Sequence, residues 1–174
     1  MIFCRLDLYF FPILDIYTPI DRTILGYKEL FSPIRRFSMK KAAVIHDLSG
    51  FGKCSLTAAI PVLSALGVQC CPVATAVLTG QTGYPCYHCT DLTAMLPDYI
   101  DAWGKNNAHF DAIYSGFLTG AKQISQVLDF IRYFREEHTL LLVDPVMGDD
   151  GNAYPFFTPG LLNGMKELTL KADV

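Results

Sequence analysis

Residues 140–151 read Leu-Leu-Leu-Val-Asp-Pro-Val-Met-Gly-Asp-Asp-Gly, a short apolar run followed by an acidic turn that contains glycine. The run Leu140–Val143 is typical of a buried parallel strand that ends at Asp144. Carboxylates at a strand end and just beyond it, in a turn that contains glycine, would suit Mg²⁺ held through water and phosphate oxygens. A solvated acidic turn would show the same spacing, so both interpretations stay open at this point.

Outward from this stretch, apolar runs with strand character alternate with segments of helical spacing. Strands are predicted at 42–45, 68–74, 112–114 and 140–143, and helices at 53–66, 91–103, 121–137 and 160–170. Pro61 should kink or break the first helix, Asp91 is the N-cap candidate of the second, and Thr158-Pro159 opens the last. This alternation predicts an α/β fold with a mainly parallel sheet and right-handed crossovers.

Three further segments follow predicted strands, at the sheet edge where ligands of open α/β proteins bind. Residues 46–53 contain glycines that let a backbone approach a ligand, or that cap the next helix. Residues 75–84 are rich in small hydroxyl side chains and glycine, which suits either a wall around a small polar ring or an ordinary polar loop. In residues 115–120, Phe117 is either a stacking surface for an aromatic ligand or a core residue.

The composition bounds the class of protein. The chain has 174 residues, 51% of them hydrophobic and 18% charged, which is enough for one domain with a single large core. A formal net charge of -3 provides no basic field for nucleic acid or an anionic membrane, so neither is an expected partner. The 6 cysteines are scattered, and we expect a reduced, cytoplasmic protein. Cys86 and Cys89 form a lone C-x-x-C, which we interpret as two ordinary thiols rather than a metal knuckle or redox pair.

Residues 1–38 differ from the rest of the chain. Their apolar stretches are interrupted by charges and prolines, so none approaches the ~20 residues of a membrane span, and the pattern of a signal peptide is missing. Met39-Lys40-Lys41 then leads directly into the first predicted strand. We expect residues 1–38 to be an N-terminal extension outside a domain formed by residues 39–174. The extension is either the product of a misassigned start or a real segment packed on the surface.

Four segments together resemble a known family. The pattern D-P-V-M-G-D-x-G at 144–151 is combined with D-L-S-G-x-G at 47–52, T-x-x-L-T-x-x-T-G-Y at 75–84 and S-G-F-L at 115–118. Over about residues 40–174 the chain is therefore similar to the bacterial pyridoxal/pyridoxamine kinases of the ribokinase-like superfamily. The hydroxymethylpyrimidine kinases of thiamine synthesis share D-P-V-M but typically continue it differently, and they remain an alternative.

The resemblance implies a ribokinase-like three-layer α/β/α fold and ATP-dependent phosphorylation of the 5′-hydroxymethyl group of pyridoxal, pyridoxamine or pyridoxine. It implies Mg²⁺ as the cofactor, ATP and a B6 vitamer as small-molecule partners, and a homodimer when the protein is full length. Asp47 and Ser49 would meet polar atoms of the pyridine ring, and Thr82 and Gly83 would lie in the substrate loop. The same resemblance makes Phe117 the residue that packs against the ring. It puts Asp144 and Asp149 on the ATP side, where they would reach the metal through water or phosphate.

Relatives in this family continue with an I-T-P-N segment and, much later, a G-x-G-D motif. In that motif the glycine amides form an anion hole and the aspartate activates the substrate hydroxyl. The 174 residues contain neither motif, so we assign no catalytic residue and interpret residues 39–174 as the N-terminal portion of the kinase domain. We expect the chain alone to have negligible turnover. A non-catalytic remnant that still binds the vitamin is the other alternative.

Overall fold

The computed structural model describes residues 39–149, 151–154 and 157–174. The predicted extension at 1–38 lies outside these residues. The described elements, in chain order, are β1 (Lys41–Ser49), α1 (Ser55–Ala65), β2 (Gln69–Leu78), β3 (Cys89–Asp91), a 3₁₀ turn η2 (Thr93–Met95), α2 (Leu96–Lys105), β4 (Ala112–Ser115), α3 (Ala121–Phe134), β5 (Leu140–Val143), the hairpin strands β6 (Gly148–Asp149) and β7 (Asn152–Ala153), and α4 (Pro159–Thr169).

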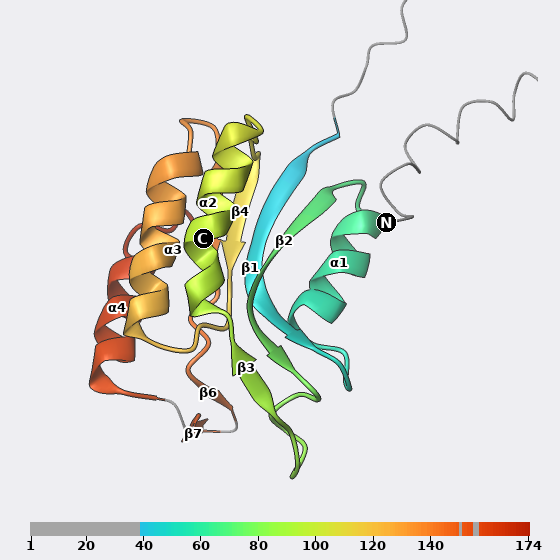
Figure 1. Cartoon of the computed structure of the whole chain (residues 1–174), viewed down its shortest axis with the longest axis vertical. Helices are drawn as coiled ribbons and strands as arrows, with labels where there is room; N and C mark the ends of the chain where they lie inside the picture. Colours follow the sequence, from blue (N-terminus) through green and yellow to red (C-terminus); the bar gives the residue numbers. More distant parts are fainter. Residues whose placement is uncertain (1–38, 150, 155–156) are drawn as a thin grey trace, which may run out of the picture. The chain divides into compact units, whose positions relative to one another are not determined.

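A five-stranded sheet in the order β3-β2-β1-β4-β5 forms the middle layer. Strands β2, β1, β4 and β5 are parallel, and only the edge strand β3 is antiparallel. Helix α1 covers one face of the sheet, and α2, α3 and α4 cover the other (Figure 1). The predicted three-layer α/β/α arrangement with a mainly parallel sheet is confirmed.

The central strand β1 is buried on both of its faces. Ala43 and Ile45 belong to the large core beneath α2, α3 and α4, whereas Ala42 and Val44 belong to the smaller core beneath α1. Successive side chains of a strand point to opposite faces, so a strand between two helical layers needs apolar residues at every position. This explains the unbroken apolar run at 42–45.

Two strands run further than the sequence predicts. β1 continues through His46 and Asp47 to Ser49, with a shift in its register against β2 between His46 and Leu48. β2 continues to Leu78 because its last residues pair with both β1 and the antiparallel β3. The polar residues of these two segments therefore lie on rigid strands, and only the residues after them form loops. The prediction that both strands end earlier was wrong, since backbone pairing continues where the apolar run stops.

Helix boundaries were predicted with mixed success. α4 begins as predicted, since the hydroxyl of Thr158 accepts a hydrogen bond from the amide of Leu161 at 3.1 Å. α1 continues through Pro61 without a break, contrary to the prediction of a possible break there. Asp91 is the last residue of β3 and does not cap α2; its Oδ1 accepts the Thr93 amide at 2.8 Å instead. Among the described residues, no helix is both long and apolar enough to cross a bilayer.

Candidate functional site

A cavity of about 620 Å³ opens where the carboxyl ends of β1, β2 and β4 meet. Six residues that the sequence singled out line it: Asp47, Ser49, Thr82, Gly83, Phe117 and Asp144. They come from four separate segments of the sequence, and the parallel sheet gathers them because the strands end at the same edge. The seventh, Asp149, lies in β6, and its side chain is outside the described part of the structure.

The cavity extends along α1, which sequence reasoning missed. The helix contributes Ser55, Ala58, Ala59, Val62 and Leu63 to its lining. Ser55, the pair Ala58 and Ala59, and the pair Val62 and Leu63 follow one another at intervals of three or four positions, so they share one face of the helix. A stripe of small and apolar residues at that spacing was the available signal, but the same stripe is also common where a helix simply packs closely on a sheet.

Asp47 is a buried carboxylate in the wall of the cavity. Its side chain is 6% exposed, and Ser49 donates a hydrogen bond from Oγ to Asp47 Oδ2 at 2.9 Å. Burial raises the pKa of Asp47, but the interactions with His46, Ser55 and Ser49, named in decreasing order, outweigh it and hold the pKa below its ordinary value. The cavity therefore presents an ionised acceptor at its polar end.

His46 precedes Asp47 and was not assigned a role from the sequence. Its Nδ1 accepts the backbone amide of Phe117 at 3.2 Å, and its Nε2 lies 3.4 Å from the hydroxyl of Tyr114. Because Nδ1 is the acceptor, the network places the ring proton on Nε2, where it faces Tyr114. Burial, and secondly the charge of Asp144, raise the pKa of Tyr114, so its hydroxyl keeps its proton.

Gly116 makes room for the His46 ring. A Cβ added to Gly116 would lie 1.8 Å from Nε2 of His46, far inside van der Waals contact. The glycine in the S-G-F-L segment is thus required by the approach of an imidazole from β1. The sequence alone offered no sign of that contact, because His46 lies in β1 and Gly116 lies in the segment after β4.

Phe117 belongs to the cavity lining and to a small core cluster at the same time. Its side chain is 6% exposed and lies in one cluster with the buried residues Ala76 and Leu78, against which Tyr87 and Val146 also pack. The two interpretations left open by the sequence, a ligand surface and a core residue, are therefore compatible. A ring held in this way offers a fixed apolar wall to the cavity.

The loops after β1 and β2 are joined by backbone hydrogen bonds. Gly50 donates to Leu78 at 2.9 Å, Phe51 donates to Thr79 at 3.1 Å, and Gln81 donates back to Phe51 at 2.9 Å. The rings of Phe51 and Tyr84 also pack together, with centroids 4.8 Å apart. This pairing fixes the loop that carries Thr82 and Gly83 beside the end of β1.

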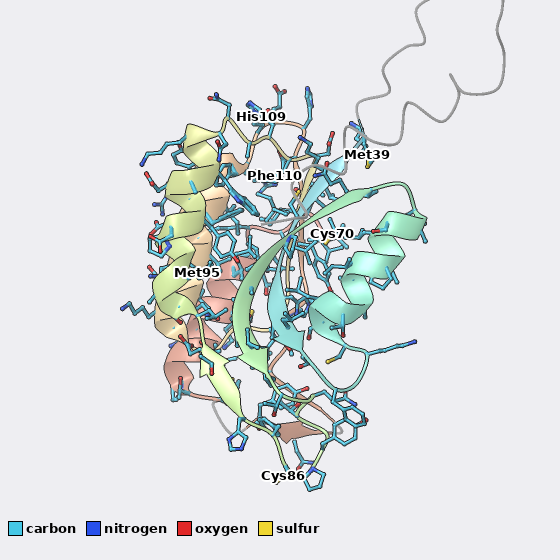
Figure 2. The ribbon with its side chains drawn as sticks, turned by 45° about the vertical axis from the view of Figure 1, so that its right-hand side comes forward. Met39, Cys70, Cys86, Met95, His109 and Phe110 are labelled. Atoms are coloured by element: carbon cyan, nitrogen blue, oxygen red, sulfur yellow. The ribbon has the colours of Figure 1, made fainter. Side chains whose placement is uncertain are left out.

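Asp144 follows β5 at the rim of the cavity, and its amide donates to the carbonyl of Ser115 at 2.8 Å. Within the described ranges, no group of three or more His, Cys, Asp or Glu side chains is placed to hold a metal ion. Cys86 and Cys89 are free, exposed thiols in the structure. Cys86 lies at the loop end of the sheet, away from His109 and Phe110 at the other end (Figure 2).

Comparisons with known proteins show which proteins have a similar fold. No protein-family model and no curated protein matches the chain. Among solved structures, the chain is similar to a Bacteroides thetaiotaomicron protein named as a phosphomethylpyrimidine kinase and crystallised with pyridoxal, with 47% identity over 78% of this chain and a TM-score of 0.75. It is also similar to the pyridoxal kinase of Lactobacillus plantarum, with 31% identity over 78% of this chain and a TM-score of 0.71. The chain has the pyridoxal kinase fold.

The pyridoxal kinase of Leishmania donovani, crystallised with ADP and pyridoxamine, shares this fold at 21% identity, with a TM-score of 0.72 over 77% of this chain. The chain spans about half the length of these kinases: 47%, 49% and 48% of the Bacteroides, Lactobacillus and Leishmania proteins. The resemblance inferred from the four sequence motifs is confirmed at the level of fold and of related kinases.

Proposed function

We propose that this chain provides the vitamin-binding part of an ATP-dependent kinase that phosphorylates the 5′-hydroxymethyl group of pyridoxal, pyridoxamine or pyridoxine. The observation that carries the proposal is the gathering of six residues from four kinase-like motifs around one cavity of about 620 Å³. That volume lies in the ~300–1,000 Å³ range of small-molecule sites. By resemblance, we also propose a cytoplasmic protein that forms homodimers.

The cavity suits a small planar ring with polar substituents. Phe117 offers an apolar surface, Asp47 offers an ionised acceptor, and Thr82 offers a hydroxyl that can donate or accept. The ring would lie between these groups with its hydroxymethyl arm directed to the Asp144 side. Phosphoryl transfer depends chiefly on such positioning and on stabilising the charge of the transferred group.

The nucleotide side of the proposed site is represented by Asp144 and Asp149. Mg²⁺ in kinases is usually held by one or two carboxylates together with phosphate oxygens and water. Asp144 is an exposed carboxylate at the cavity rim, which fits that donor set. When bound, the ion would neutralise charge on the nucleotide phosphates; Asp144 would hold it through water or phosphate.

Hydroxymethylpyrimidine is the rival substrate. The similarity to a protein named as a phosphomethylpyrimidine kinase and crystallised with pyridoxal supports testing both rings. The protein expressed from its whole gene should be assayed with MgATP and each of pyridoxal, pyridoxamine, pyridoxine and hydroxymethylpyrimidine. Chromatography measures the phosphorylated product. We expect the highest kcat/KM with a B6 vitamer.

The Phe117→Ala variant should raise KM for the vitamer by about tenfold or more, since it removes an aromatic wall. In the wild-type protein, a higher kcat/KM with hydroxymethylpyrimidine than with any B6 vitamer would overturn the substrate assignment. Binding of vitamers without any phosphorylated product would favour a non-catalytic vitamin-binding protein.

A further inference from the structure

The backbone of Phe117 is held by two buried side chains from neighbouring strands. His46 of β1 accepts the Phe117 amide at Nδ1 with a separation of 3.2 Å. Thr75 of β2 donates its hydroxyl to the Phe117 carbonyl at 2.9 Å. His46 is 5% exposed and Thr75 is fully buried, so water cannot easily replace either partner. Side chains thus occupy the amide and the carbonyl of the residue that forms the apolar wall.

Gln123 of α3 supports the same segment from the other side. Its Nε2 donates to the Thr75 carbonyl at 2.8 Å and to the Thr93 hydroxyl at 3.1 Å, while its Oε1 accepts the Thr119 amide at 2.8 Å. Residues 116–119 belong to no helix or strand. Even so, they are tied to β1, β2 and α3 through this buried polar network.

Such a network makes alternative conformations of the segment costly. A buried carbonyl or amide that loses its partner costs about 1–3 kcal/mol, so movement of Phe117 away from its position would carry that penalty. A wall that is already ordered also lowers the entropy that a ligand must offset when it binds. The hydrogen bonds of His46 and Thr75 therefore act on the ligand through Phe117. His46 also lines the cavity itself, whereas Thr75 does not belong to its lining.

We propose that His46 and Thr75 are positioning residues of the cavity, which hold Phe117 where a planar ring ligand packs against it. This inference rests on the proposed function, because the ring is that of the B6 vitamer. It predicts that these two residues affect the vitamer and leave MgATP, on the Asp144 side, unaffected.

Thr75→Val tests the hydroxyl, because valine keeps the branched shape and removes the donor. In the protein expressed from its whole gene, which is also used for the other variants below, we expect KM for pyridoxal to rise about five- to tenfold and KM for MgATP to change by less than about twofold. Hydrogen–deuterium exchange of residues 116–119, measured without ligand, should become faster. Thr75→Ser keeps the hydroxyl and should recover most of both effects.

Thr139→Val is the matched control. Thr139 is also a buried threonine, at 4% exposure, and its hydroxyl donates to the Phe110 carbonyl at 3.0 Å. Phe110 lies at the opposite end of the sheet from the cavity loops (Figure 2). This variant should lose a comparable amount of stability and leave KM for pyridoxal unchanged.

His46 is tested with two amide side chains of different length. Asparagine can bring a carbonyl oxygen to about the place of Nδ1, whereas glutamine extends towards the place of Nε2. We expect His46→Asn to keep slow exchange at residues 116–119 and a near-normal KM for pyridoxal. His46→Gln should lose both.

Each outcome decides the inference. Unchanged exchange at residues 116–119 in Thr75→Val, or an equal rise in KM for pyridoxal and MgATP, would show a merely structural role and overturn it. A raised KM for pyridoxal in Thr139→Val would overturn it as well. If the wild-type protein neither binds nor phosphorylates a vitamer, the proposed function is wrong and the positioning role is wrong with it. If the wild-type protein phosphorylates the vitamer and the variants do not behave as expected, only the role of His46 and Thr75 is wrong.

Discussion

At the scale of single residues, several polar side chains of the site form hydrogen bonds within the protein itself. Ser49 donates to Asp47, and His46 joins the Phe117 amide to the Tyr114 hydroxyl. In a buried site, polar groups without partners are costly, so this mutual satisfaction fixes their geometry. Beside this network, Asp47, Thr82 and Phe117 contribute to the lining of the cavity.

Gly116→Ala should be one of the most damaging small substitutions in this part of the chain. The new methyl group would meet Nε2 of His46 at 1.8 Å, so the imidazole must leave its place. We expect a loss of roughly 1–3 kcal/mol in the free energy of unfolding, as is typical of overpacking. Chemical denaturation measures it.

Gly83→Ala is the control for that measurement, because a Cβ at Gly83 meets nothing within 4 Å. Its stability should stay within about 0.5 kcal/mol of wild type. Equal stability of Gly116→Ala and Gly83→Ala would show that the His46 ring is not packed on Gly116.

At the scale of elements, the sequence predicted where most helices and strands exist better than where they end. The stripe of apolar residues at 121–137 and the Thr158-Pro159 start led to α3 and α4, because helical spacing and capping are local signals. The end of β1 depends on pairing with β2. The end of β2 depends in turn on β3, a three-residue edge strand whose residues are all exposed and show no apolar pattern. The short hairpin of β6 and β7 was missed for the same reason.

In the candidate site, too, the sequence indicated the residues that lie in local motifs and did not indicate the contacts between distant segments. Motifs identified Asp47, Thr82 and Phe117 because each lies in a glycine-containing segment after an apolar run. The sequence did not indicate the roles that we propose for His46 and Thr75, since a polar residue inside a strand gives no sign of its partner in another segment. Contacts across the sheet are set by register, which the sequence of one strand does not contain.

Pro61 provides a test at the level of one helix. It lies inside α1, where it cannot donate to the carbonyl of Thr57 four residues earlier. Pro61→Ala restores that donor at an exposed position, and we expect the free energy of unfolding to rise by roughly 1–3 kcal/mol. Thermal unfolding of this variant beside Ser64→Ala, an exposed change in the same helix, separates a proline effect from general helix propensity. A lower melting temperature for Pro61→Ala would mean that the proline stabilises this helix.

At the scale of the whole molecule, the described residues form three layers, and the cavity opens at one edge of the middle one. The chain spans about half the length of the kinases that share its fold (47% and 49% for two of them). The motifs that we propose for the substrate side are present, and no G-x-G-D occurs in the 174 residues. The proposed vitamer binding can therefore be tested apart from phosphoryl transfer.

A polypeptide of residues 1–174 should bind pyridoxine weakly and form no measurable phosphorylated product with MgATP. Phosphoryl transfer needs a positioned base and an anion hole, and neither is assigned here. Calorimetry measures the binding and chromatography the product, with Asp47→Asn as the variant that should bind less. Turnover at the ~1–100 s⁻¹ typical of kinases would show that the 174 residues contain the catalytic groups.

The contact between the His46 ring and Gly116 also constrains how such sequences can diverge. A side chain at position 116 would overlap the His46 ring in its present position, so it favours a smaller residue at position 46. The two positions should therefore vary as a pair: homologues that lose the imidazole are free to gain a methyl group opposite it, and homologues that keep it retain glycine. We expect a lineage that replaces glycine at position 116 to lose the histidine at position 46 first.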